Sequence, residues 1–245
     1  AGQTTDASGK GGEITVTSGA GSGGTASAGG AMKLTSGIGA TMTGGFMSLA
    51  TGYGTATSSG SLKVQTVNAG VAGISGSMLF FTGTTSSGSS GKILMATGNA
   101  NVGRAGSMVV SVGSGTTSDG GDISISSGDT NELTGGTISL SAMHGTTKSS
   151  GSVRVKTANA GVSGVSGELS FTSGTTSRGS SGAIRLTTGA ATNGKGGSIT
   201  MLVGLSKTDS GGHIVSNAGI SLPQTGGAVS ISTGAGTATS SGSVV

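Results

Sequence analysis

The chain has 245 residues, of which 54 are Gly, one is Pro and none is Cys or Trp. Charged residues make up 8% and aromatic residues 2%, both well below the usage of ordinary globular domains. The net charge is only +4, and the Lys and Arg residues are dispersed from Lys10 to Lys207. A nucleic-acid partner is not expected, because the basic stripe and the stacking aromatic residues that such binding needs are absent.

The same composition excludes several kinds of site and of protein. Without Cys, neither disulfides nor thiolate metal sites are available. No apolar run approaches the ~18 residues that a membrane span requires, so no membrane insertion is expected. Richness in Gly, Ser and Thr is typical of disordered segments. However, hydrophobic residues still make up 32% of the chain, and they are regularly placed.

Along the chain, pairs of apolar residues separated by one residue recur, mostly at intervals of 15. The first interval is 18 residues, and the intervals from 62 to 78 and from 153 to 169 are 16 residues. A near-constant Gly lies two residues before each pair, and a second Gly usually follows three residues after it. The first members of the pairs are Ile14, Met32, Met47, Leu62, Met78, Ile93, Met108, Ile123, Ile138, Val153, Leu169, Ile184, Ile199, Ile214, Val229 and Val244.

A longer repeat lies above the short one. The two 16-residue intervals are 91 residues apart, and GTATSSGS at 54–61 returns as GTTKSSGS at 145–152 and GTATSSGS at 236–243. TTSSGSSGKILMATG at 84–98 likewise returns as TTSRGSSGAIRLTTG at 175–189. Chance similarity does not place the 16-residue irregularity twice in phase, so the pattern indicates tandem duplication. Its approximate phases are 1–61, 62–152 and 153–243.

Alternation with period two within each apolar pair predicts a short strand, with turns at the flanking glycines. A second strand of small residues is expected in stretches such as 54–57. A 15-residue repeat cannot close a core alone, but stacked repeats can. We therefore predict an all-β fold, a β-solenoid of about sixteen coils with a flattened two-sheet cross-section, continuous over 1–245.

The 91-residue copies sort positions by exposure. Residues expected to face inward change conservatively, as in Met78 to Leu169, whereas outward positions change freely, as in Leu94 to Arg185. Four outward positions on three successive repeats are apolar, which predicts a patch for lateral or inter-subunit contact. The alternative is a patch covered by a local loop. The patch residues are Leu79, Phe81, Leu94 and Val109.

No catalytic, cofactor or metal site is predicted. The histidines, His144 and His213, are not echoed in the 91-residue copies, as a repeated site would be. Asp119 and Asp122 flank a turn and would hold at most one adventitious cation, because the other turns lack the Asp of calcium-binding repeats. No Asn-x-Ser/Thr sequon occurs, whereas O-glycosylation of Ser and Thr stays open.

The Thr-x-Thr stretches raise ice binding as an alternative. Such stretches occur at 15–17, 41–43, 55–57 and 237–239. Charged and large aliphatic residues interrupt the expected columns, so a flat hydroxyl lattice is not favoured. Both ends of the chain lie inside a repeat, and neither carries a cap, which leads us to expect a window of a longer protein or end-to-end stacking.

The run SSG-x-Φ-x-Φ-x-TG, with NAG-V-x-G-Φ-SG at 68–76 and 159–167, resembles very long Gly/Ser/Thr-rich repeat proteins of unicellular algae such as diatoms. This resemblance covers nearly the whole chain and implies an extracellular or cell-surface setting. The function expected from the residues is a structural, non-enzymatic one: the shaft of an extracellular or cell-surface filament that self-associates end to end or laterally. The alternative is a binding surface, as an adhesin stalk or an ice-binding protein.

Overall fold

A computed structural model describes residues 10–24, 27–237 and 240–245. The chain divides into two compact halves, Ala1–Asp122 and Ile123–Val245. Neither half contains an α-helix or a β-strand within the described ranges. The prediction of a β-solenoid is therefore wrong, and so is the expectation of two strands in each repeat.

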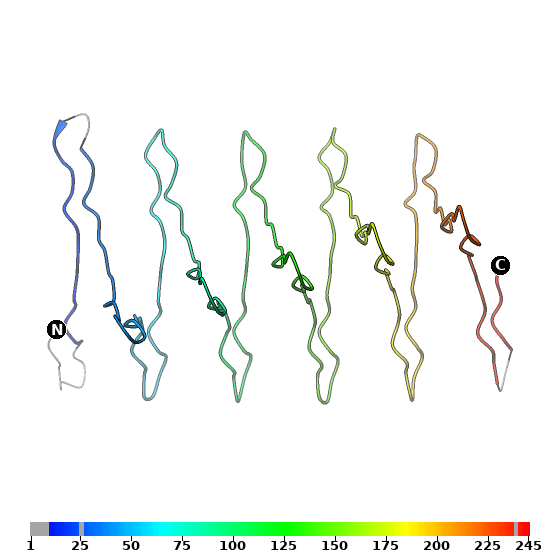
Figure 1. The fold of residues 1–245 in the computed structure, drawn as a ribbon, viewed down its shortest axis with the longest axis horizontal. Coiled ribbons are helices and arrows are strands. Elements are labelled where there is room, and N and C mark those ends of the chain that lie inside the picture. Colours follow the sequence, from blue (N-terminus) through cyan, green and yellow to red (C-terminus); the bar gives the residue numbers. More distant parts are fainter. Residues whose placement is uncertain (1–9, 25–26, 238–239) are drawn as a thin grey trace. The chain divides into compact units, whose positions relative to one another are not determined.

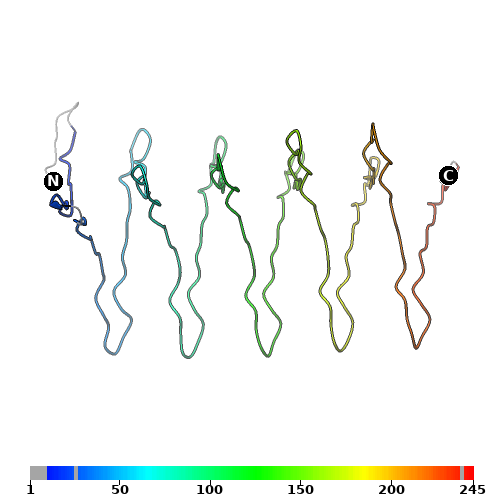
Figure 2. The ribbon, with the colours of Figure 1, turned by 90° about the horizontal axis from the view of Figure 1, so that it is seen from above.

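Each repeat instead consists of an extended segment followed by a loop in which the chain reverses (Figure 1). The reversals follow one another at intervals of 15 residues, with 16 at the two irregular repeats. Figure 2 shows the same alternation of extended segments and loops in a perpendicular view. The reversing residues are 40–42, 55–57, 71–73, 86–88, 101–103, 116–118, 131–133, 146–148, 162–163, 177–179, 192–194, 207–209 and 222–224.

The predicted coils would place equivalent residues of successive repeats at the spacing of about 4.8 Å between paired strands. No such strand pairing is found among the described residues, and each repeat contributes one extended segment and one reversing loop. The stretch 54–57, predicted as a second strand, lies in the loop that reverses at 55–57.

The glycines that flank the apolar pairs meet at the base of the loops. The Gly60 N–H donates to the Gly52 carbonyl oxygen at 2.9 Å, and the Gly136 N–H donates to the Gly128 oxygen at 2.8 Å. In each case the donor lies eight residues after the acceptor. The same bond joins Gly45 to Gly37, Gly151 to Met143, Gly227 to Gly219 and Gly242 to Gly234.

Of the two residues at the loop base, the second has the stricter requirement for glycine. A Cβ on Gly136 would lie 3.1 Å from the Cβ of Ser127 and 3.3 Å from the Gly128 nitrogen, whereas a Cβ on Gly128 would meet nothing within 4 Å. Met143 occupies the first position in one loop and still accepts the Gly151 N–H at 3.0 Å. The second position is Gly in every repeat.

The irregular repeats keep their extended segments and lengthen only their loops. A Cβ on the second base glycine usually lies near a side chain nine residues earlier, as for Gly91 and Thr82. In the 16-residue repeats the distance in sequence becomes ten residues, as for Gly76 and Thr66. Every extended segment therefore spans seven residues, from its glycine to the small or β-branched residue that opens the next loop. These segments include 60–66, 76–82, 91–97, 106–112, 151–157, 167–173 and 182–188.

No hydrophobic core forms within the described residues. The exposed fraction of the first apolar residue of a pair ranges from 44% at Met78 to 73% at Ile14. That of the second ranges from 59% at Val155 to 79% at Leu140. The predicted packed interior is thus not found, because successive segments are joined at the loop bases but do not stack apolar pair on apolar pair.

Candidate functional site: an exposed apolar surface

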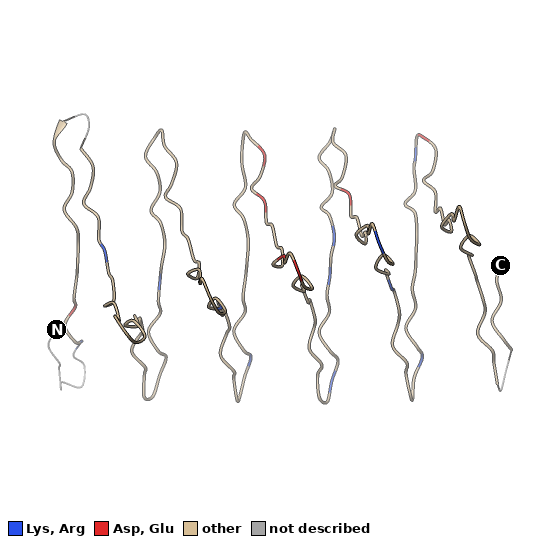
Figure 3. Cartoon of the chain, viewed as in Figure 1, with Lys and Arg blue, Asp and Glu red and all other residues tan. Residues whose placement is uncertain are grey.

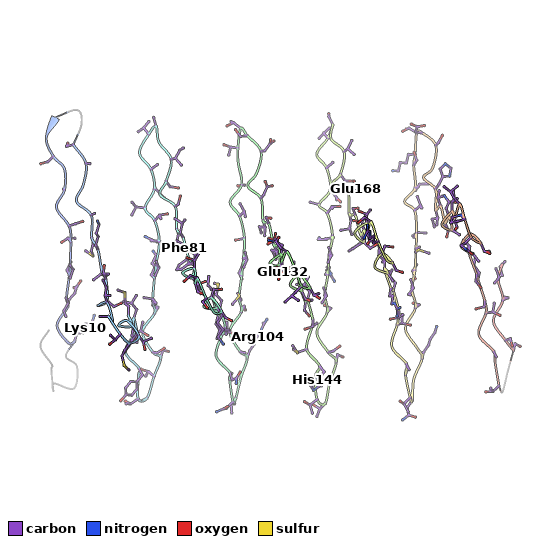
Figure 4. All side chains as sticks on the ribbon, viewed as in Figure 1. Lys10, Phe81, Arg104, Glu132, His144 and Glu168 are labelled. Carbon is purple, nitrogen blue, oxygen red and sulfur yellow. The ribbon has the colours of Figure 1, made fainter. Side chains whose placement is uncertain are left out.

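The predicted contact patch is fully open to solvent. Its four residues lie on three consecutive extended segments of the first half, 76–82, 91–97 and 106–112. Their exposed fractions run from 71% at Leu79 to 81% at Val109. Figure 4 shows the side chains along these segments and labels Phe81. No described loop covers the patch, so the alternative of a locally covered surface is not observed.

Further apolar residues on the same three segments are exposed as well. Phe80, Met95 and Val110 are the second members of their apolar pairs, which the solenoid prediction places in the interior, yet each has an exposed fraction of 72%. Both sides of these segments therefore present apolar atoms to solvent, since successive residues of an extended chain point to opposite sides. The unbroken run Met78-Leu79-Phe80-Phe81 was the sequence signal for such a surface. We call these seven residues the apolar surface: Leu79, Phe80, Phe81, Leu94, Met95, Val109 and Val110.

The corresponding positions of the second half are more polar. Ser170, Thr172, Arg185 and Thr200 lie 91 residues after the four predicted patch residues. A shallow hollow of about 230 Å³ is lined by Phe171, Ile184, Arg185 and Leu186. Arg185 is the one charged residue in this otherwise apolar lining, whereas the corresponding residue of the first half is Leu94.

The titratable residues that the structure describes are spread along the chain. Figure 4 shows His144 at a chain reversal, next to the base residue Met143, whereas His213 lies on the extended segment 212–218. Figure 3 shows Lys and Arg as isolated positions along the ribbon. Among the described residues, no group of three or more His, Asp or Glu side chains is arranged to hold a metal ion. Asp119 and Asp122 are both exposed.

Two of the Thr-x-Thr stretches lie where the chain turns. Residues 55–57 form a reversal, and residues 41–43 overlap the reversal at 40–42. The stretch 15–17 lies on an extended segment, and 238–239 fall outside the described residues. A flat array of Thr side chains requires extended backbone in adjacent repeats, which the described turns do not supply.

Within the described ranges, no helix has the length and apolar character needed to cross a bilayer. Comparisons with protein-family models, curated protein sequences and solved structures found no match.

Proposed function

We propose that this protein is a structural, non-enzymatic repeat chain that self-associates to form the shaft of an extracellular or cell-surface filament. The observation that carries the proposal is the amount of apolar surface left in water by a single chain. An assembly of many copies would bury that surface, and regular repeats would let the same contact recur along a fibre.

The accessible area of the chain is much larger than that of a compact protein of the same mass. The chain exposes 24373 Å². A compact monomer of 22.6 kDa would expose about 9,500 Å², and its unfolded chain about 33,000 Å². The excess over a compact monomer is many times the roughly 1,200–2,000 Å² buried in a standard stable interface. A second copy, rather than a small ligand, matches a surface of that extent.

The apolar surface of the first half is the contact that we assign to this association. Exposed apolar patches of this kind typically mark protein contacts. Apolar residues on both sides of segment 76–82 allow one copy to be contacted from two directions, which a growing filament requires. Burying one such side chain contributes about 1.5–3 kcal/mol, so several together outweigh the cost of ordering two chains.

The test is sedimentation velocity over a concentration series, followed by electron microscopy of the concentrated sample. We expect larger species to grow with concentration and to appear as uniform filaments. Monodisperse monomers at every concentration would refute the proposal. Thermal hysteresis in the monomeric fraction would instead support the ice-binding alternative.

A further inference from the structure

The reversal loop at 189–197 contains the one Asn-Gly pair in the chain, Asn193-Gly194. The other six asparagines precede Ala, Val or Glu: they are Asn68, Asn99, Asn101, Asn131, Asn159 and Asn217. We infer that Asn193 is a site of spontaneous modification, at which the side-chain amide is converted to a carboxylate through a cyclic imide.

The chemistry needs only the peptide and water. The backbone nitrogen of Gly194 loses its proton and attacks Cγ of Asn193, a new C–N bond closes a five-membered imide, and the side-chain nitrogen leaves as ammonia. Water then opens the ring at either carbonyl, which yields aspartate or isoaspartate. No electrons are transferred, and the overall change is the addition of one water and the loss of one ammonia.

The structure favours this attack at Gly194. Apart from its chain neighbours, no heavy atom lies within 4 Å of the place where a Cβ on Gly194 would stand. Residues 192–194 form an exposed reversal, and no hydrogen bond between described residues holds either member of the pair. Glycine adds backbone freedom, because it has no Cβ to restrict approach. The backbone around the reacting nitrogen is therefore free to reach the imide geometry.

The charge of the loop acts in the same direction. Lys195 is the one charged residue in 189–197, and no acidic residue occurs there. A nearby ammonium stabilises the anionic nitrogen that performs the attack. The position 91 residues earlier carries Val102-Gly103, which keeps the glycine but lacks the reactive amide. The modification thus adds one negative charge to one of two otherwise parallel loops, and it does not depend on the proposed filament.

Mass spectrometry of the intact purified chain after timed incubation tests this inference. Samples are held at mildly acidic and at alkaline pH, and are then digested with trypsin at mildly acidic pH to limit artefacts. Trypsin releases 186–195, which contains Asn193, and 93–104, which contains Asn99 and Asn101. We expect 186–195 to yield two products of equal mass, aspartate and isoaspartate, faster at alkaline pH, while 93–104 stays unchanged.

The variant Gly194→Ala provides the matched control, since it keeps Asn193 and restores a Cβ beside the attacking nitrogen. Its conversion should slow at least several-fold. Conversion of 186–195 no faster than that of 93–104, or equal rates in Gly194→Ala and the original chain, would overturn the inference.

Discussion

Residues 58–98 and 149–189 are two copies of one sequence, and the copies agree at the loop bases but differ along the extended segments. Both copies keep the second base glycine of every loop, because a side chain there would meet the other side of the loop base. Between the bases, Leu79, Phe81 and Leu94 of the first copy correspond to Ser170, Thr172 and Arg185 of the second. The loop base thus constrains the repeat, whereas the segment surface is free to distinguish one copy from the other.

The largest effect is expected from removing this distinction in the first copy. The four-residue variant Leu79→Ser, Phe81→Thr, Leu94→Arg and Val109→Thr gives these positions the residues that stand 91 positions later in the chain. Loss of several apolar contacts should weaken association on the order of a hundredfold. Sedimentation velocity over a concentration series measures it.

A three-residue variant at polar positions of the extended segments controls for substitution as such. Each of three serines directly follows the glycine that opens its extended segment: Ser61, Ser77 and Ser107. Changing them to Thr preserves their polarity. Association of this control should stay within about twofold of the original chain. An equal loss in both variants would contradict the role of the apolar surface.

The reverse change in the second copy should have a smaller and opposite effect. Arg185→Leu removes the charge beside Phe171 and Leu186 and leaves an apolar side chain at the rim of the hollow. Association should strengthen about tenfold, equivalent to about 1.4 kcal/mol. The same concentration series gives the result, and Arg185→Lys, which keeps the charge, should leave association unchanged. Weaker association in Arg185→Leu would show that Arg185 itself makes the contact.

A local test concerns the hydrogen bond at a loop base, here the base formed by Gly128 and Gly136, which lies outside the two copies. Gly136→Val places a side chain against Ser127 and Gly128. It should therefore break the hydrogen bond that the backbone N–H of residue 136 donates to the Gly128 oxygen. One backbone hydrogen bond contributes about 0.5–1.5 kcal/mol, so exchange of that amide should quicken about two- to tenfold. Hydrogen exchange followed by NMR measures it. Gly128→Ala, at the open side of the same base, should leave the rate unchanged.

The smallest effect is expected from loop length. Deleting Ile74 shortens the loop between Thr66 and Gly76 to the ordinary length and leaves segments 60–66 and 76–82 intact. Association should change by less than about twofold, since loop-closure free energy varies slowly with length. Deleting Lys92 instead moves Leu94 to the opposite side of segment 91–97, and should weaken association clearly. Equal effects of the two deletions would mean that loops and segments are not separate elements.

How much the sequence predicts differs between these elements. The sequence predicts the period, the 91-residue duplication and the chain reversals near the flanking glycines, because the glycines recur at regular spacing. The fold class was not: alternation in a pair such as Ile123 and Ile125 signals extended backbone, but says nothing about which segment lies beside it. The prediction of the apolar surface named Leu79, Phe81, Leu94 and Val109, and omitted Phe80, Met95 and Val110 because these were assigned to an interior.

The amino-acid sequence by itself determined where the chain extends and where it reverses, since both follow from local side-chain size and backbone freedom. Only the tertiary structure decided that the extended segments do not pair as strands in the described residues. It also decided that the apolar pairs stay in water. Strand pairing and burial depend on how separate segments meet, and a repeated local pattern is compatible with more than one such arrangement.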